Sequence, residues 1–328
     1  FGNYPLPFNI RKNQSGLALV SVLLVIFVLV AVTGRLTSNH NIVVSRHANT
    51  FEHNQAIQYL FGAESMAKEA LYNDYLTTGS KIDHLGEIWA SNIMPFELDE
   101  GGFLEIHVND LNACVNLNNV LSETSKESVK TVNKLLLTLG LPTEIEDLWR
   151  DWIDKDSEVK GLGAEDMDYA SNQIPYRTPN RIVINFSELM LLRSISAEHL
   201  SALSQYACLV PDSNSRINVN TAPAEVLQVL SENASVSELV RLTETQRAFE
   251  SPEQFVQSFP KFQKSLGKIT TSSMYFEMSA QAKVGNTQVS LSSLIYRNPK
   301  DGKISILKRD FGKLFTSKIQ IETEIQSI

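Results

Sequence analysis

The chain has 328 residues, of which 43% are hydrophobic and 20% are charged, and its formal net charge is −8. This length and hydrophobic content exclude wholesale disorder and allow a membrane segment together with one or two domains that have cores of their own. The negative net charge argues against a nucleic acid as the main partner.

An uncharged apolar run extends from Leu17 to Gly34 and follows the basic pair Arg11 and Lys12 after a short spacer. A hydrocarbon core of about 30 Å needs about 20 apolar residues at 1.5 Å rise per residue, so a helix that begins at Leu17 just crosses a membrane. The basic pair keeps the N-terminus in the cytoplasm and places the bulk of the chain on the other side. An ordinary secretory signal fits poorly, because it has a shorter apolar core and ends in a small-residue cleavage site.

Gly16 stands directly before the apolar run, so a cut after this glycine leaves the whole apolar segment on the mature chain. This order of basic residues, glycine and apolar helix resembles the class III signal of type IV pilins and type II secretion pseudopilins. The resemblance implies that the prepilin peptidase, a membrane aspartyl peptidase, cleaves between Gly16 and Leu17.

Ser21 occupies the fifth position after this expected cut, where ordinary pilins have a glutamate. That glutamate can pair with the N-terminal ammonium of a neighbour inside the bilayer, where an unpaired ion is costly. A subunit with serine cannot make this pairing, so we expect a subunit with nothing stacked on top of it. Alternatively, the serine hydroxyl merely hydrogen-bonds back to its own helix.

The helical pattern continues beyond the membrane segment through a stretch without proline, and it predicts one helix from Leu17 to about Tyr75. Such length without an internal cap is typical of a helix that both spans a membrane and packs on a domain. Its apolar stripe must be buried, partly on a sheet and partly on partner helices. The residues expected in these contacts are Ile57, Leu60, Phe61 and Leu71.

Alternating apolar and polar residues over 101–110 predict a strand in which Glu105 and His107 belong to a solvent-exposed face. Strand patterns return only between Met274 and Gly312, where turn residues separate three segments. Most of the sequence between these strands has helical periodicity. The predicted fold is α+β, with a long pilin-like N-terminal helix packed on a small antiparallel sheet and a large all-α domain inserted.

The expected domains follow from these patterns. Residues 1–16 form the cytoplasmic leader and residues 17–34 the transmembrane part of the helix. The soluble half of the helix and the first strand, the inserted helical domain, and the remaining strands with the C-terminal tail occupy residues 35–109, 110–270 and 271–328.

The segment 147–169 is dense in carboxylates, and such density usually needs a cation. Counted from Asp154, carboxylates fall at positions one, three, five and twelve, which is the ligand spacing of a calcium loop. Val159 stands where the sharp turn of an EF-hand needs glycine, so we expect an irregular oxygen cage for calcium; magnesium fits less well because it keeps its waters. The candidate ligands are Asp154, Asp156, Glu158, Glu165, Asp166 and Asp168. A solvated acidic loop without an ion is the alternative.

Cys114 and Cys208 are the two cysteines of the chain, and they form either one disulfide in an oxidising compartment or two buried thiols. We expect no enzyme. The six histidines lack metal-ligand spacing with a partner carboxylate, and the pair Asp151 and Asp154 is weak evidence for acid/base catalysis.

Two short stretches, ACVNLNNVL from Ala113 and RINVNTAPAEVL from Arg216, echo one another. In both, Asn or Thr precedes a helical run and is placed to cap it. The second stretch also resembles the opening of a helix-hairpin-helix nucleic-acid module, although the glycine-bearing hairpin is missing and basic residues are few. A membrane-anchored DNA-binding protein of DNA uptake is therefore the alternative function.

The motifs NLNN, WRDWIDKDSE, GAED, PYRTPN, SELMLLRSI and INVNTA follow one another inside the pilin-like frame. This succession resembles the general secretion pathway protein K family, the large minor pseudopilins of type II secretion, over nearly the whole chain. The resemblance implies an inner-membrane anchor with the bulk of the chain in the periplasm, and calcium in the helical insertion. It also implies a place at the pseudopilus tip with minor pseudopilins I and J, where the subunit supports export of folded proteins across the outer membrane.

Overall fold

The computed structural model of the chain describes residues 15–78, 81–91, 95–98, 101–122 and 125–317. Most of the predicted leader, residues 1–14, and the end of the C-terminal tail, residues 318–328, lie outside the described residues.

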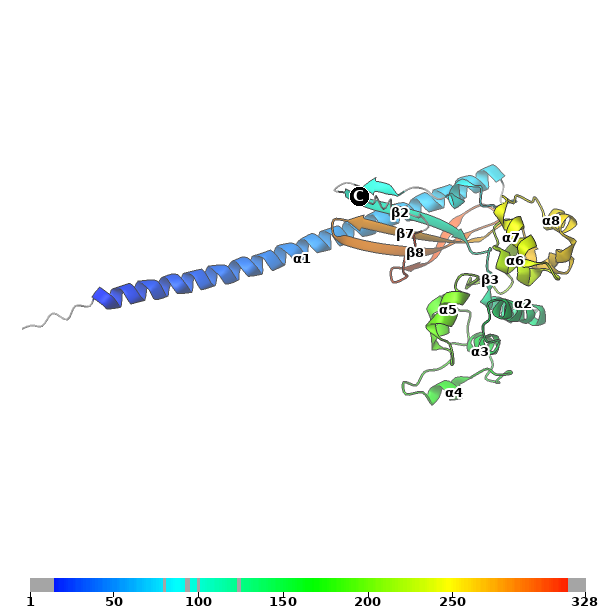
Figure 1. The fold of residues 1–328 in the computed structure, drawn as a ribbon, viewed down its shortest axis with the longest axis horizontal. Helices are drawn as coiled ribbons and strands as arrows, with labels where there is room; N and C mark the ends of the chain where they lie inside the picture. The colour runs from blue at the N-terminus through cyan, green and yellow to red at the C-terminus, as the bar shows by residue number, and fades with distance from the viewer. Residues whose placement is uncertain (1–14, 79–80, 92–94, 99–100, 123–124, 318–328) are drawn as a thin grey trace, which may run out of the picture.

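Helix α1 (Ser15–Thr78) is one continuous helix of 64 residues, as the sequence predicted. Its N-terminal half projects from the body of the molecule, and its C-terminal half lies along a sheet (Figure 1). The projecting half contains an apolar window that is long enough to cross a membrane, and none of this window is buried against the rest of the chain. The C-terminal half of the helix therefore packs on the sheet, and the N-terminal half presents an apolar surface that suits a membrane.

The sheet contains five antiparallel strands in the order β1-β2-β7-β8-β9. The strands are β1 (Phe96–Leu98), β2 (Gly102–Asp110), β7 (Tyr275–Val284), β8 (Thr287–Arg297) and β9 (Ile304–Asp310). Strand β2 pairs with β7 although about half of the chain separates them, and Asp110 lies opposite Phe276. The predicted strands are all present, whereas β1 was missed because an alternation of only three residues, Phe96 to Leu98, is too short to indicate a strand.

The core of this pilin domain lies between α1 and one face of the sheet. Alanines at positions 56, 63 and 67 of α1 let the helix approach the strands closely, and Leu60 and Leu71 fill the remaining space with 0% exposure. This burial corrects the expectation that Leu60 and Leu71 contact partner helices, because the sheet of the same chain already covers them. Ile57 is half-buried beside this core, and Phe61 is exposed at its edge.

The other face of the sheet is not solvent-exposed at β2, contrary to the prediction. Glu105 and His107 are 5% and 3% exposed, and their side chains are joined by a hydrogen bond of 2.7 Å. The chain after β9 crosses over them, since the Phe315 ring stacks on His107 and the Ser317 hydroxyl donates to Glu105. A period of two identified the two faces, but it could not show that a distant segment covers the second one.

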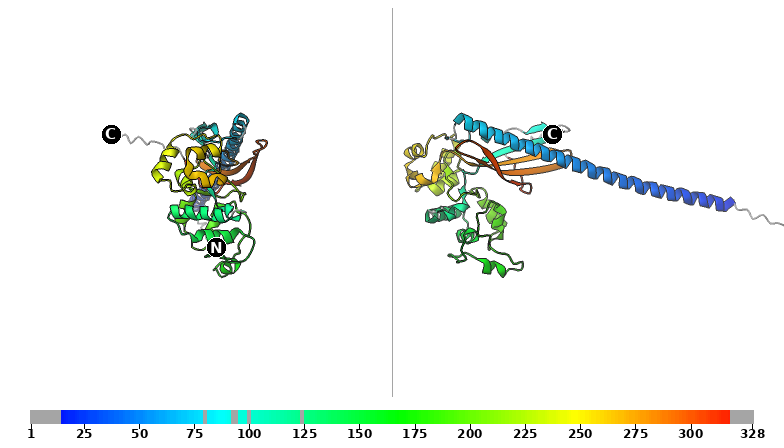
Figure 2. Two further views of the ribbon diagram at one scale, coloured as in Figure 1. Left: turned by 90° about the vertical axis from the view of Figure 1, so that its right-hand side faces the viewer. Right: turned by 180° about the vertical axis from the view of Figure 1, so that it is seen from behind.

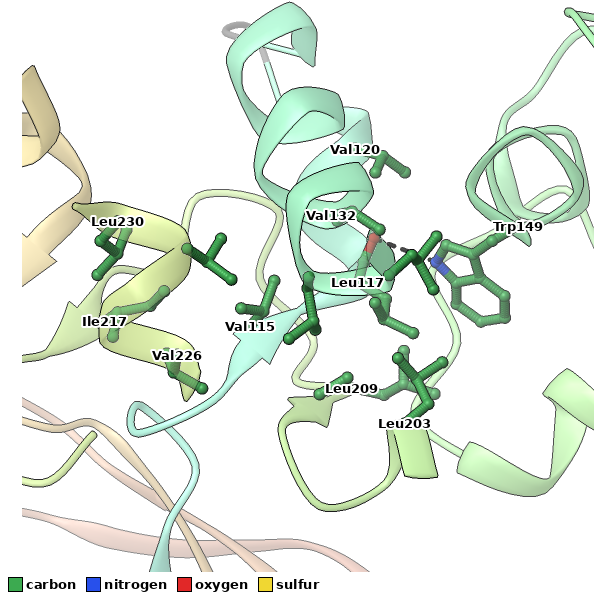
Figure 3. Packing of buried hydrophobic residues seen from close by; sticks show 14 of the residues in the cluster. Val115, Leu117, Val120, Val132, Trp149, Leu203, Leu209, Ile217, Val226 and Leu230 are labelled. Atoms are coloured by element: carbon green, nitrogen blue, oxygen red, sulfur yellow. Dashed lines mark hydrogen bonds between the residues drawn. The ribbon is translucent and has the colours of Figure 1, made fainter. Parts of the chain in front are cut away.

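A helical domain lies between β2 and β7. The view from behind in the right panel of Figure 2 shows it at the end of the sheet that is remote from the start of α1, as Figure 1 does. It has its own hydrophobic core, separate from that of the sheet, in which the Trp149 indole N–H donates to the carbonyl of Leu117 at 3.1 Å (Figure 3). The elements of its first part are β3 (Val115–Asn116), η3 (Leu117–Leu121), α2 (Ser125–Thr138), α3 (Glu144–Ile153), α4 (Asp166–Ala170), η4 (Phe186–Leu191), α5 (Ala197–Leu203) and β4 (Ala207–Cys208). Those of its second part are β5 (Ile217–Asn218), α6 (Ala224–Leu230), α7 (Val236–Glu244), α8 (Pro252–Ser258), η5 (Pro260–Lys268) and β6 (Ile269–Thr270).

Each part of the helical domain is closed by a short parallel strand pair, β3 with β4 and β5 with β6. The echoed Asn-x-Asn stretches open the two parts. The Asn116 side chain caps η3 by accepting from the Asn118 N–H, as predicted, whereas the N-cap of α6 is Pro223 and makes no side-chain hydrogen bond. The predicted cap of the second helix is therefore wrong.

The structure joins Cys114 and Cys208 in a disulfide. Cys208 ends β4 and lies opposite Asn116 of β3, so the bond ties together the beginning and the end of the first part of the helical domain. Of the two alternatives that the sequence left open, the structure contains the disulfide.

Candidate metal centre and its surroundings

The loop between α3 and α4 brings three of the predicted carboxylates together. One oxygen from each of Asp154, Asp156 and Glu165 lies within 4.8 Å of the others. Asp154 is the C-cap of α3, and Glu165 is the N-cap of α4, so two helix ends hold the loop closed. Asp151 lies one turn before Asp154 on α3, and its carboxylate acts electrostatically on Glu165.

Several carboxylate oxygens in this cluster lack a hydrogen-bond donor of normal geometry among the described residues. They are Oδ1 of Asp151, Oδ1 of Asp154 and both oxygens of Glu165. The three residues are 0%, 8% and 4% exposed, so water does not reach them freely. Buried acceptors without a donor are rare and costly, and hard divalent cations prefer oxygen ligands of this kind. The donor set therefore fits a calcium ion.

The charges of the cluster also favour a cation. Burial and the neighbouring carboxylates of Asp151 and Asp154 raise the pKa of Glu165 to about 7. Burial, opposed by a hydrogen bond from the Lys160 amide and assisted by Asp154, raises the pKa of Asp151 as well. A bound divalent ion would lower the pKa values of Glu165 and Asp151 again, because it would be the largest charge in the site.

Two glycines let the loop fold back on α3. A Cβ at Gly163 would lie 2.0 Å from Oδ2 of Asp151, and Gly161 has φ +58° with a Cβ position 2.3 Å from Oδ2 of Asp147. The amides of Lys160 and Leu162 donate to these two carboxylates at 3.0 Å. Val159 stands where an EF-hand has its turn glycine, and here Gly161 and Gly163 allow the chain to turn instead.

The other predicted ligands lie apart from this cluster. Glu158 is exposed, and the carboxylate of Asp166 accepts from the amide and the hydroxyl of Thr178 at 2.8 and 2.7 Å. Asp168 accepts from the Glu165 amide at 3.0 Å and lies 3.6 Å from Arg193. The structure therefore places these three predicted ligands outside the cluster that Asp154, Asp156 and Glu165 form. Asp151 was missed, although its spacing of three from Asp154 on a predicted helix places both on one face.

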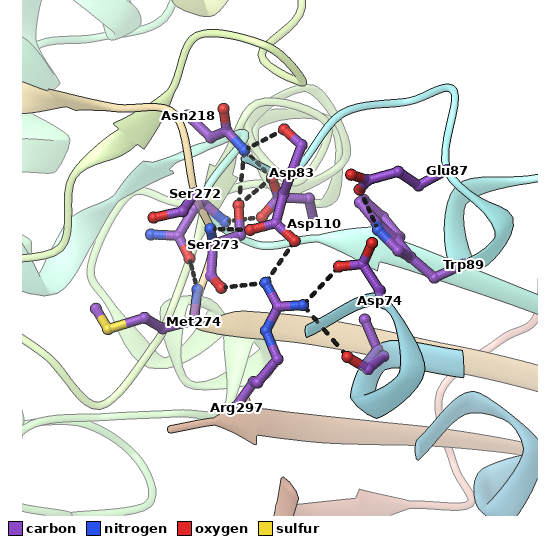
Figure 4. A network of polar contacts seen from close by, with 12 residues as sticks. Asp74, Asp83, Glu87, Trp89, Asp110, Asn218, Ser272, Ser273, Met274 and Arg297 are labelled. Carbon is purple, nitrogen blue, oxygen red and sulfur yellow. Dashed lines mark hydrogen bonds and ion pairs between the residues drawn. The ribbon is translucent and has the colours of Figure 1, made fainter. Parts of the chain in front are cut away.

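A second acidic cluster surrounds Arg297 between the sheet and the helical domain (Figure 4). The guanidinium is completely buried and pairs with Asp74 at 2.8 Å and with Asp83. It also donates to the carbonyls of Leu71 and Ser273 at 3.3 and 3.0 Å. Because an arginine already occupies the centre of this cluster, we assign it a structural role.

The stretch INVNTA belongs to this junction. The Asn218 side chain is 0% exposed and donates to Asp110 at 3.2 Å and to the Ser273 hydroxyl at 2.8 Å. The Asn220 side chain accepts from the Phe249 amide at 2.9 Å and is 1% exposed. These polar side chains are therefore used inside the fold and are not presented to a phosphate backbone.

The face of α1 that points away from the sheet carries exposed apolar side chains, among them Phe51, Tyr72 and Leu76, which are 68%, 39% and 61% exposed. Phe61 lies near this face but is partly covered, since its ring meets Phe311 edge-on and lies 5.5 Å below the guanidinium of Arg309. Of the four residues predicted for partner contact, Phe61 and Ile57 remain accessible in part.

Comparison with known proteins adds to this geometry. Residues 113–212 and 217–271, which are the two parts of the helical domain, match family models described as type II secretion system protein K. The type II secretion system protein K of Pseudomonas aeruginosa is 32% identical over 92% of this chain and 94% of that protein, and that of Aeromonas hydrophila is 28% identical over 91% and 97%. A chain in the crystal structure of the GspK-GspI-GspJ complex of enterotoxigenic Escherichia coli superposes with a TM-score of 0.72 and 25% identity, and the match covers 82% of this chain and 100% of that one.

The long N-terminal helix, the antiparallel sheet and these matches define a minor pseudopilin of type II secretion. More narrowly, the chain belongs to the type II secretion system protein K family. The similarity extends over both the pilin domain and the helical insertion, and it favours this function over DNA binding.

Proposed function

We propose that this minor pseudopilin forms the tip of the type II secretion pseudopilus, where it supports export of folded proteins across the outer membrane. The observation that carries the proposal is the position of the helical domain at the end of the pilin domain that is remote from the projecting half of α1. A second subunit stacked above would meet this domain. Ser21 in place of a glutamate supports the same position, because the subunit lacks the carboxylate that pairs with a neighbour.

The projecting half of α1 is proposed to cross the inner membrane once, with the bulk of the chain in the periplasm. The exposed apolar window and the basic residues before it support this orientation. The prepilin peptidase is proposed to cut between Gly16 and Leu17. N-terminal sequencing of the mature chain tests the cut, and a start near Arg35 or an uncut chain would contradict it.

Minor pseudopilins I and J are proposed as the partners, since the structural relative is part of a complex described as GspK-GspI-GspJ. The exposed face of α1, with Phe51, Tyr72 and Leu76, supplies apolar surface for their helices. Co-expression of the three full-length proteins should give one complex of one copy each, as measured by light scattering after purification in detergent. Three separate species, or filaments of this chain alone, would overturn the tip assignment.

The acidic loop is proposed to hold calcium through Asp151, Asp154, Asp156 and Glu165. The ion would supply the positive charge that the buried oxygens lack and would tie the ends of α3 and α4 to one loop. Its role is structural, since the chain is proposed to have no catalytic activity. An ion that binds only the folded state stabilises it by mass action.

Chelation tests the calcium proposal. EGTA should lower the melting temperature of the full-length chain in detergent, and Asp154→Asn should abolish this response because it removes one charged ligand. Glu158→Gln is the matched control, because Glu158 lies outside the cluster and its neutralisation should leave the response intact. Equal melting temperatures with calcium and with EGTA for the unaltered chain would reject the site.

A further inference from the structure

The ammonium group of Lys160 lies inside the oxygen cluster. Its Nζ pairs with Oδ2 of Asp156 at 2.8 Å and with Oδ2 of Asp154. These two residues, together with Glu165, are the ones whose oxygens lie within 4.8 Å of one another. The ammonium therefore holds a place beside the same carboxylates that a cation would bind.

We propose that Lys160 is the resident counter-cation of the metal-free loop and that calcium binds by displacing its ammonium group from Asp154 and Asp156. This inference rests on the calcium site proposed above and concerns its regulation. An ammonium group and a calcium ion both bind carboxylate oxygens as compact positive charges at similar distances. A calcium ion held by the carboxylates of Asp154 and Asp156 would lie where the ammonium group lies, so the two compete for these side chains.

The loop is built so that the side chain can leave without the backbone. The Lys160 amide donates to Oδ2 of Asp151 at 3.0 Å, and the Gly163 amide donates to the carbonyl of Lys160 at 2.9 Å. The side chain itself is 35% exposed, so it has a path to solvent. Only the four-carbon side chain must change its conformation when calcium enters.

The carboxylates hold the ammonium firmly in the absence of calcium. Its Nζ lies within ion-pair distance of one oxygen of Asp154 and one oxygen of Asp156, so two negative charges stabilise it there at once. The exchange therefore weakens calcium binding and at the same time preserves the loop when calcium is scarce. A site with a built-in competitor fills only at high free calcium, as in extracellular modules.

The test compares Lys160→Met with Lys155→Met in the full-length protein in detergent. Both variants remove one lysine charge from the same loop, but Lys155 has no ion pair among the described residues. Calcium affinity is measured by isothermal titration calorimetry, and the melting temperature is measured with calcium and with EGTA. Lys160→Met should lower the dissociation constant about tenfold, which corresponds to about 1.4 kcal/mol, relative to Lys155→Met.

The melting temperatures separate displacement from simple repulsion. Displacement predicts that Lys160→Met lowers the melting temperature in EGTA and leaves it unchanged in calcium, because the side chain no longer contacts the carboxylates in the loaded state. Equal affinities of the two variants, or an equal loss of melting temperature in both conditions, would overturn the inference while the calcium site stands. If neither the unaltered chain nor Lys160→Met binds calcium, the site and the inference both fail.

Discussion

Asp110 is the last residue of β2 and the first point where the chain enters the helical domain. Its carboxylate accepts from the Asn112 amide at 2.6 Å and from the Ser273 hydroxyl at 2.6 Å. Thr221 and Asn218 of the second part of the helical domain donate to the same carboxylate at 2.5 and 3.2 Å. The Asp110 side chain thus connects the two chain segments between the sheet and the helical domain, at Asn112 and at Ser273, to the second part of that domain.

The protonation of Asp110 gives the junction a pH dependence. Burial, against hydrogen bonds from Ser273 and Thr221, raises the pKa of Asp110 from 3.8 to about 6. The folded chain therefore binds this proton more tightly than the unfolded chain, and the stability that it contributes is lost as pH rises from about 4 through about 6. From pH 5 to pH 7.5 the loss should be about 1 kcal/mol. Burial raises the pKa of Asp83 to about 6 as well, so it contributes with the same sign.

Asp110→Asn should reduce this decrease in the free energy of unfolding between pH 5 and pH 7.5, since the group no longer titrates. Urea unfolding of the full chain in detergent at the two pH values measures it. Asp301→Asn, on an exposed loop, is the control and should keep the slope of the unaltered chain. Identical slopes for all three proteins would show that Asp110 does not titrate in this range.

At the scale of single residues, spacing predicted part of the acidic site. Asp154, Asp156 and Glu165 come together as their positions in the loop required. Glu158, Asp166 and Asp168 share the composition but face Thr178, Arg193 or solvent. A count along the sequence cannot show where the backbone turns, and the turn here depends on Gly161 and Gly163, which lie at positions where the EF-hand pattern requires no glycine.

Among the elements, α1 and β8 are fastened to each other at the far end of the sheet by Arg297. Its guanidinium forms ion pairs with Asp74 of α1 and with Asp83, which follows the helix. It also lies 5.0 Å from the centre of the Phe276 ring. Breaking a buried pair by removing one partner costs about 3–5 kcal/mol, because the other charges stay buried.

Arg297→Met should therefore lower the free energy of unfolding by about 3–5 kcal/mol, as measured by urea unfolding at pH 7.5. Arg181→Met provides the comparison, since Arg181 is exposed and lies 3.7 Å from Glu188. An exposed pair is worth less than about 1 kcal/mol. Similar losses for the two variants would mean that the buried network adds nothing beyond a surface pair.

One face of α1 packs on the sheet, and the opposite face is proposed to bind the partner pseudopilins. Substitutions on the two faces should therefore affect stability and complex formation separately. Leu71→Ala opens the sheet core and should cost about 2–5 kcal/mol of stability. Leu76→Glu changes a side chain that is 61% exposed, so it should leave the melting temperature unchanged and weaken the complex with the two partner pseudopilins. Size-exclusion chromatography of the mixture together with thermal melting measures both effects. A loss of melting temperature in Leu76→Glu without loss of the complex would contradict this division.

The elements themselves were largely predictable, because long periodic segments specify them. The single helix and the strands over 102–110 and 275–310 follow from periods of 3.6 and 2. The failures concern features that depend on distant contacts. The strand β1 exists only through its pairing with β2, and the covered face of β2 depends on residues 311–317, which the strand pattern does not include.

At the scale of the whole molecule, two separate cores give two separately stabilised parts. The disulfide and the acidic loop both belong to the first part of the helical domain. Residues 114 and 208 are separated by 94 positions, so the bond restricts a long loop of the unfolded chain. Loss of such a bond typically costs about 2–5 kcal/mol.

Replacing Cys114 and Cys208 by serine should therefore destabilise the helical domain and leave the sheet domain unaffected. Hydrogen exchange measured by mass spectrometry distinguishes the two, because α2 and α3 should lose protection while β7 and β8 keep theirs. Equal loss of protection in both domains would show that they unfold as one unit.

The order of domains was predictable from the sequence because the strand pattern stops at Asp110, gives way to helical patterns, and resumes at Tyr275. Their relative placement was not. It depends on Asp110, Asn218 and Arg297, whose buried contacts join residues more than 100 positions apart, and no local pattern encodes such distances.

The helical domain leaves the sheet at Asp110 and returns at Tyr275, on two strands that pair directly with each other. Two neighbouring antiparallel strands need only a tight turn between them. Residues 111–274 are thus an enlarged hairpin turn, and their growth does not change the register of the strands on either side. The size and chemistry of residues 111–274 can therefore change without altering the pairing of the sheet or its packing on α1.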